Sequence, residues 1–121
     1  MRGLNAYQAA RVETASPSAV LVMLMHTAVL KLESALQRDP KDLPGYQADL
    51  HHVRSIYFEL VMALDDAAAP ELCAELRRLY SWCIRELVEA SKSRSDSHVE
   101  GVLRVTRTLG EAWTEAVEEI S

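Results

Sequence analysis

Basic side chains are few in this sequence, and they form no cluster. The 121 residues include 13 Lys and Arg against 18 Asp and Glu, which gives a formal net charge of −5. Nucleic-acid-binding proteins usually present a basic face, and electrostatic attraction to anionic lipid needs one as well. The composition therefore supports neither kind of partner.

Cysteine is also scarce. The two cysteines, Cys73 and Cys83, lie ten residues apart in what we predict to be a single helix. At a rise of about 1.5 Å per residue they would be roughly 15 Å apart, which is beyond the reach of a disulfide. We therefore expect two free thiols and a reducing, cytoplasmic environment.

No stretch is both long and apolar enough to predict membrane insertion. Residues 20–30, VLVMLMHTAVL, are apolar almost all the way round a helix, but Lys31 and Glu33 follow at once. A transmembrane helix needs about 20 apolar residues. Residues 1–8 also lack the apolar run of a secretory signal. We therefore predict neither an anchor nor a signal, and expect the apolar stretch to contact protein.

Helical periodicity occurs four times, between short polar breaks. Apolar residues recur at helical spacing over residues 17–38, 44–64, 70–90 and 98–120. Four helices of similar length, joined by short connections, are expected to pack antiparallel to their neighbours. We therefore predict an all-α fold, an antiparallel up-down four-helix bundle formed by residues 16–121. Residues 1–15 are predicted to be a short N-terminal capping segment.

Residues with known positional preferences mark the helix ends. Ser16 followed by Pro17 is typical of an N-cap and the first helical position. The polar run SKSRSDS, residues 91–97, has nothing to bury and is predicted to be a solvated loop. Ser97 and Glu100 have the spacing of a capping box, so we expect them to start the last helix.

Several helices carry large apolar residues away from the face that would line a bundle core. On the first helix, Met23 and Leu30 lie opposite the core face with His26 between them, and on the second Phe58 and Met62 lie outside the core stripe. Isolated exposed apolar residues are ordinary, but stripes of them more often mark a partner or a covering segment. We therefore predict partner-binding residues on these helices: Met23, His26, Leu30, Ile56, Phe58, Met62 and Trp82.

A covering segment is present in the sequence as well. Residues 1–13 contain Leu4, Tyr7 and Val12, which is enough for one or two weakly amphipathic turns. An isolated helix this short is marginal in water. We therefore expect the segment to be held only where those side chains meet an apolar groove.

Residues suited to catalysis or metal binding do not form a set. Asp49 and His52 have the spacing found in di-iron carboxylate bundles, but such a site needs two of these motifs and further inward glutamates. We expect this pair to lie on the surface, off the core face, and His26 to be exposed or partly covered. The four glycines form no phosphate-binding loop, and we expect Gly101 and Gly110 to permit close helix packing. We predict no enzyme activity, metal or cofactor.

The order of short motifs resembles a known family. The chain reads NAY from Asn5, then VE-TASP, then an apolar helix with ML at 23–24, and later SIY…LD, PEL…LYSW and LGEAW. Together these are similar to the flagellin-specific export chaperones of the FliS type over nearly the whole chain. The resemblance implies a small cytoplasmic helical bundle that binds the disordered C-terminal segment of flagellin and prevents premature polymerisation. It also implies the flagellar type III export gate as a further partner.

The resemblance assigns roles to two regions and shows one departure. It implies that Asn5 and Tyr7 belong to a mobile N-terminal cap over part of the flagellin surface. The second apolar stripes would then be grooves for amphipathic flagellin helices. Where the family usually has Tyr-Asp-Gly in the first helix, this chain has Met25, His26 and Thr27. The alternative is a structural module in which the stripes bury one another in a homodimer, without a flagellin ligand.

Overall fold

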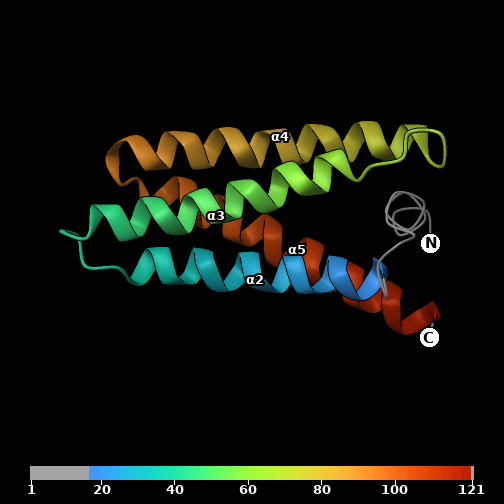
Figure 1. The fold of residues 1–121 in the computed structure, drawn as a ribbon, viewed down its shortest axis with the longest axis horizontal. Coiled ribbons are helices and arrows are strands. Elements are labelled where there is room, and N and C mark those ends of the chain that lie inside the picture. The colour runs from blue at the N-terminus through green and yellow to red at the C-terminus, as the bar shows by residue number, and fades with distance from the viewer. Residues whose placement is uncertain (1–16, 121) are drawn as a thin grey trace.

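The computed structural model describes residues 17–120, apart from the side chains at 17, 18, 117, 119 and 120. The described residues form four helices and no strand: α2 (Pro17–Gln37), α3 (Leu43–Met62), α4 (Pro70–Ser93) and α5 (Asp96–Ile120). Successive helices run in opposite directions (Figure 1), which confirms the predicted up-down four-helix bundle. The predicted capping segment, with Leu4, Asn5, Tyr7 and Val12, lies outside the described residues.

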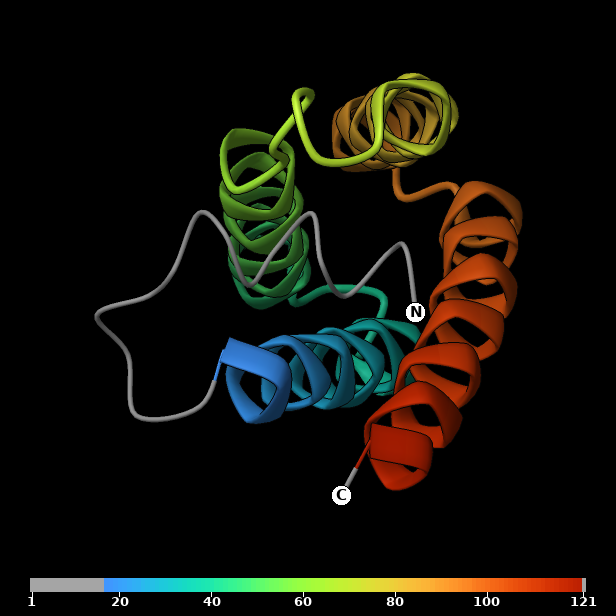
Figure 2. The same cartoon turned by 90° about the vertical axis from the view of Figure 1, so that its right-hand side faces the viewer.

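The four helices form a closed ring. Each helix packs on the next in the chain, and α5 returns to pack against α2. In the end-on view of Figure 2, α2 and α4 lie on opposite sides of the ring, with α3 and α5 between them. Helix α2 therefore has two seams, one with α3 and one with α5.

The core follows the predicted apolar stripes closely. On α3, all the predicted core positions are buried: Tyr46, Leu50, Val53, Tyr57, Leu60 and Leu64 just beyond its end. The rings of Tyr57 and Tyr80 are 5.5 Å apart between centroids, and Tyr80, which the periodicity did not select, is fully buried. Thr106 is buried too, because its hydroxyl donates to the carbonyl of Val102 at 2.7 Å and accepts from the Tyr57 hydroxyl.

Helix α3 begins where local polar groups satisfy its first amides. The Asp42 carboxylate accepts a hydrogen bond from the backbone N–H of Gly45 at 3.0 Å, which is the hydrogen bond expected of an aspartate N-cap. Pro44 follows in the first turn, where its missing N–H leaves no donor unpaired. A Cβ at Gly45 would collide with the Asp42 carboxylate, so a larger residue here would displace the capping side chain.

The connection between α4 and α5 is shorter than predicted. Helix α4 continues to Ser93 and α5 begins at Asp96, so residues 94 and 95 replace the expected loop of residues 91–97. The predicted capping box is therefore wrong, because Ser97 lies inside the first turn of α5 rather than at its N-cap.

Contacts made by Arg94 explain why this polar run turns so tightly. Arg94 adopts a left-handed conformation with φ of 49°, and its N–H bonds the carbonyl of Ala90, which ends α4. Its guanidinium donates to the carbonyls of Arg38 at 2.8 Å and Asp39 at 3.1 Å, at the end of α2. The same group lies 4.4 Å from the centroid of the Tyr46 ring. The Arg94 side chain thus supplies hydrogen-bond donors to carbonyls at the end of α2. The local sequence around Arg94 could not predict this contact.

Asp49 is buried, contrary to the prediction that it forms a surface pair with His52. Its side chain is 3% exposed and accepts hydrogen bonds from Ser34 Oγ at 2.8 Å and Arg38 Nε at 3.0 Å, both from the α2 side. Burial alone would raise the pKa of Asp49, but the hydrogen bonds from Arg38 and Ser34 and the guanidinium charge outweigh it and lower that pKa. His52 remains exposed.

By length and composition alone, α2 is the one described helix that could cross a membrane, over Ala19–Gln37. In the bundle, its most apolar face packs on α3 and α5 instead, since Ala28, Leu32 and Ala35 are each 0% exposed. The same stretch carries Lys31 and Glu33. Its hydrophobicity is thus largely that of a core helix, with additional apolar residues that face outward.

Candidate functional site

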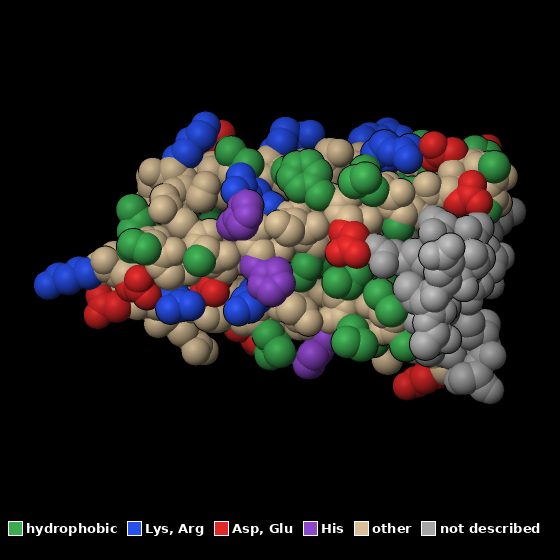
Figure 3. All heavy atoms as spheres, in the orientation of Figure 1, with side chains coloured by type: hydrophobic (Ala, Val, Ile, Leu, Met, Phe, Trp, Pro, Cys, Tyr) green, Lys and Arg blue, Asp and Glu red, His purple; other side chains and the backbone are tan. Residues whose placement is uncertain are grey.

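The apolar residues predicted to lie off the core faces are exposed. The exposed fractions are 66% for Met23, 52% for Leu30, 54% for Phe58 and 84% for Met62. His26 is exposed as well. Figure 3 shows hydrophobic side chains spread over this face of the molecule, with histidines among them. Their binding role stays a prediction, but their availability to a partner is a property of the fold.

The exposed apolar residues form two separate groups. Those on α3 do not lie on the side of α3 that faces α2, so they do not continue the group on α2. Asp49 accepts hydrogen bonds from Ser34 and Arg38, so the side of α3 that carries Asp49 faces α2. Gln47 donates from its side chain to the Ser91 carbonyl of α4 at 2.9 Å, and Phe58, three turns further along, lies on that side of α3. Phe58 and Met62 therefore form a ridge of their own, apart from Met23 and Leu30 on α2.

Two other predicted binding residues lie elsewhere. Ile56 is only 3% exposed and belongs to the core, so its assignment to a binding surface is wrong. The reason is its position seven residues after Asp49, on the side of α3 that faces α2. Trp82 is partly buried on α4, where a Cβ at Gly101 of α5 would lie 3.6 Å from its ring. Trp82 thus belongs to the α4–α5 seam, on the far side of the ring from the α2–α3 seam.

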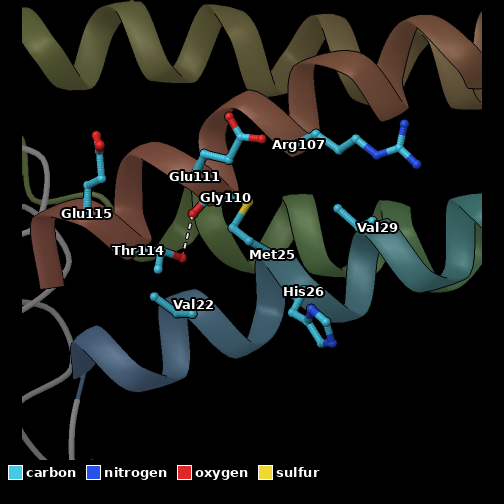
Figure 4. A pocket seen from close by; sticks show the side chains of 9 residues that line it. All are labelled: Val22, Met25, His26, Val29, Arg107, Gly110, Glu111, Thr114 and Glu115. Atoms are coloured by element: carbon cyan, nitrogen blue, oxygen red, sulfur yellow. Dashed lines mark hydrogen bonds between the residues drawn. The ribbon is translucent and has the colours of Figure 1, made fainter. Parts of the chain in front are cut away.

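A groove of about 700 Å³ runs between α2 and α5. In Figure 4, the side chains of α2 and α5 line it from opposite sides. Its floor is open at Gly110, where a Cβ would lie 3.6 Å from the Cβ of Met25. The residues that line it are Val22, Met25, His26, Val29, Arg107, Gly110, Glu111, Thr114 and Glu115.

The α2 wall of this groove is uncharged and the α5 wall is not. Residues 17–30 contain no Asp, Glu, Lys or Arg. On α5, Arg107 donates to Glu33 of α2 at 2.7 Å, which closes one end of the groove with an ion pair. The Thr114 hydroxyl donates to the Gly110 carbonyl at 2.7 Å, so its proton is used within α5. The groove therefore offers an apolar wall facing a polar and mainly acidic one.

A smaller groove of about 290 Å³ lies on the α4–α5 seam, near Trp82. Its lining is mostly apolar and includes one arginine: Leu79, Arg104, Val105, Thr108 and Leu109.

The described residues hold no metal-binding cluster, and their two thiols are buried. No group of three or more His, Cys, Asp or Glu is placed to hold a metal ion within the described residues. Both cysteines are free and buried. Burial raises the pKa of Cys83 to about 11 and also raises that of Cys73, which keeps both thiols protonated and weakly nucleophilic.

Sequence reasoning identified His26 and the outward residues of α2 but missed most of the larger groove. Val22 and Val29 have helical spacing and could have been found. Gly110, Glu111 and Glu115 could not, because nothing local shows that the end of α5 packs beside the start of α2.

Comparison with known proteins gives concordant matches. The family model described as "Flagellar protein FliS" matches residues 1–120. The chain is also 30% identical, over 122 aligned residues, to the flagellar secretion chaperone FliS of Escherichia coli (strain K12). That alignment covers 96% of this chain and 90% of the relative.

Proposed function

The chain belongs to the FliS family of flagellar proteins, and we propose that it is a chaperone that binds the disordered C-terminal segment of flagellin. Binding in apolar surface grooves would keep flagellin from polymerising in the cytoplasm before type III secretion. The family match and the name of the E. coli relative, a flagellar secretion chaperone, support this proposal. The family is one of chaperones rather than enzymes.

The α2–α5 groove is the observation that carries the proposal. Val22, Met25 and Val29 stand at helical spacing along its α2 wall, and Gly110 leaves room at its floor. A partner helix can lay an apolar stripe into such a groove. Met25 itself is buried beneath the groove, but methionine adapts well to ligands of different shape, and Met23 and Met62 are both exposed and could contact a disordered chain.

The outward residues of α2 and the α3 ridge extend the proposed surface. Met23 and Leu30 lie on α2 just outside the groove, and Phe58 and Met62 form the ridge on α3. All four side chains are more than half exposed. A disordered segment can wrap several separate apolar patches as it folds on a partner. We propose that successive parts of the flagellin segment occupy the groove and the ridge.

The test is calorimetric titration of the full chain with the C-terminal segment, about 40–50 residues long, of the flagellin from the same organism. The proposal expects one-to-one binding. Met23→Glu and Phe58→Glu should weaken it while circular dichroism shows an unchanged fold. No binding to a folded full-length chain would refute the proposal.

The exposed ridge also favours the alternative, a module that dimerises through Phe58 and Met62. In that case the mass measured by light scattering should double as concentration rises, and Met62→Glu should abolish the change. A monomer at all concentrations that binds the flagellin segment would exclude this alternative. The export gate remains a further predicted partner.

A further inference from the structure

The α5 wall of the α2–α5 groove is acidic, whereas its α2 wall is uncharged. Residues 108–121 contain four Glu and no Lys or Arg, while residues 17–30 of α2 contain no charged residue at all. Glu111 and Glu115 are exposed, and both line the groove. They are one helical turn apart on α5, so they lie along the same rim of the groove (Figure 4).

No described side chain neutralises this pair of carboxylates. Arg107 is the one Lys or Arg among the described residues that line the groove, and it donates to Glu33 at 2.7 Å. Among the described residues, neither Glu111 nor Glu115 has a hydrogen bond or ion pair of its own. Both residues lie in the C-terminal half of α5. This end of the groove is therefore apolar in its wall and negative along its rim.

We propose that the groove selects a partner helix that carries Lys or Arg beside its apolar stripe, where it faces Glu111 and Glu115. The inference rests on the proposed function, since the occupant it commits to is a helix of the flagellin C-terminal segment. The apolar wall supplies contact area, and the two carboxylates set the register and direction of the bound helix. Charge complementarity at a rim acts mainly on specificity and association rate.

The direct test replaces both carboxylates by their amides, Glu111→Gln with Glu115→Gln, in the full chain. The matched control is Glu71→Gln with Glu75→Gln, which makes the same charge change at exposed positions of α4. The probe is the flagellin C-terminal segment, titrated at low and at high salt. We expect the groove variant to bind about three- to tenfold more weakly at low salt, with most of the difference lost at high salt. The control should stay within about twofold of the wild type.

The second test finds the partner's cation. Each Lys and Arg of the flagellin segment is changed to Gln in turn, and each peptide is titrated against the wild type and the groove variant. One substitution should weaken binding to the wild type and have little effect on the groove variant, which is the sign of a direct pair.

The possible outcomes separate the two proposals. If the flagellin segment does not bind the wild-type chain, the proposed function is wrong and this inference falls with it. If it binds the wild type and the groove variant equally, only the inference is overturned. Tighter binding by the groove variant would also overturn it, because the carboxylates would then hold a competing segment of the chain itself.

Discussion

The two halves of α2 differ in how they are held. Its C-terminal half is tied by polar groups on several elements: Ser34 and Arg38 bond the buried Asp49 of α3, and Arg94 bonds the last carbonyls. Its N-terminal half has no charged residue and lies open beside α5 along the groove. Directional polar contacts hold one geometry, whereas apolar contacts tolerate several. The C-terminal half of α2 is therefore the clamped half, and its N-terminal half, beside the groove, is the open half.

The largest expected effect comes from the core of the clamped half. Leu32 is 0% exposed and Leu30, two residues earlier, is 52% exposed. Leu32→Ala should lower the free energy of unfolding by about 2–5 kcal/mol, because it leaves a cavity. Leu30→Ala should change it by less than about 0.5 kcal/mol. Urea melts of the two variants compare them directly, and equal losses would contradict the assignment of Leu30 to the surface.

The next effect concerns the buried carboxylate of the clamp. Asp49→Asn should cost about 1–3 kcal/mol at neutral pH, because the amide cannot satisfy the Arg38 guanidinium as the carboxylate does. The pKa of Asp49 is lower in the folded state than in the unfolded chain. Its contribution is therefore fully present above about pH 4, the unfolded value, and is lost as the pH falls through the folded one.

Urea melts from neutral to acid pH test this linkage. The difference in stability between wild type and Asp49→Asn should shrink as the solution becomes acidic. A difference that stays constant down to about pH 2.5 would show that the carboxylate charge contributes nothing.

Two substitutions at Arg94 separate the effect of its side-chain contacts on stability from the effect of its left-handed backbone conformation. Arg94→Ala removes the bonds to the end of α2 and the stacking on Tyr46, and should cost about 1–2 kcal/mol. Arg94→Gly loses the same contacts, but glycine tolerates the φ of 49° better than alanine. The glycine variant should therefore be about 1 kcal/mol more stable than the alanine variant. Equal thermal midpoints for the two variants would mean that the turn relaxes.

The smallest expected change in stability is an increase, and it concerns Gly110 of α5, which faces the open half of α2. Gly110→Ala should raise stability by about 0.5–1 kcal/mol, because alanine favours a helix interior and its methyl group meets Met25 at an ordinary 3.6 Å. The same methyl group narrows the groove floor, so the flagellin segment should bind about fivefold more weakly. Gly101→Ala is the matched control, since its methyl group would meet Trp82 on the other seam. It should raise stability similarly and leave binding unchanged.

Local periodicity predicted what depends on local residues. It placed four helices, and on α3 it selected the buried positions from Tyr46 to Leu64. It also identified Met23, Leu30, Phe58 and Met62 as exposed, since a residue opposite the core stripe has no interior to enter. The same reasoning failed to predict burial where a polar side chain forms hydrogen bonds with a residue distant in the sequence. Asp49 was expected at the surface, and its burial depends on Arg38, which lies just past the end of α2.

The sequence by itself determined the helices, their amphipathic faces and the lack of charge along the first half of α2, because these depend on residue type and a spacing of 3.6 residues per turn. Only the tertiary structure decided that Ile56 turns inward and that Trp82 lies on a different seam. It also decided that Glu111 and Glu115 stand across from Val22 and Val29. The physical reason is that the groove exists only where α5 closes the ring on α2, and that closure brings together residues about eighty to ninety positions apart.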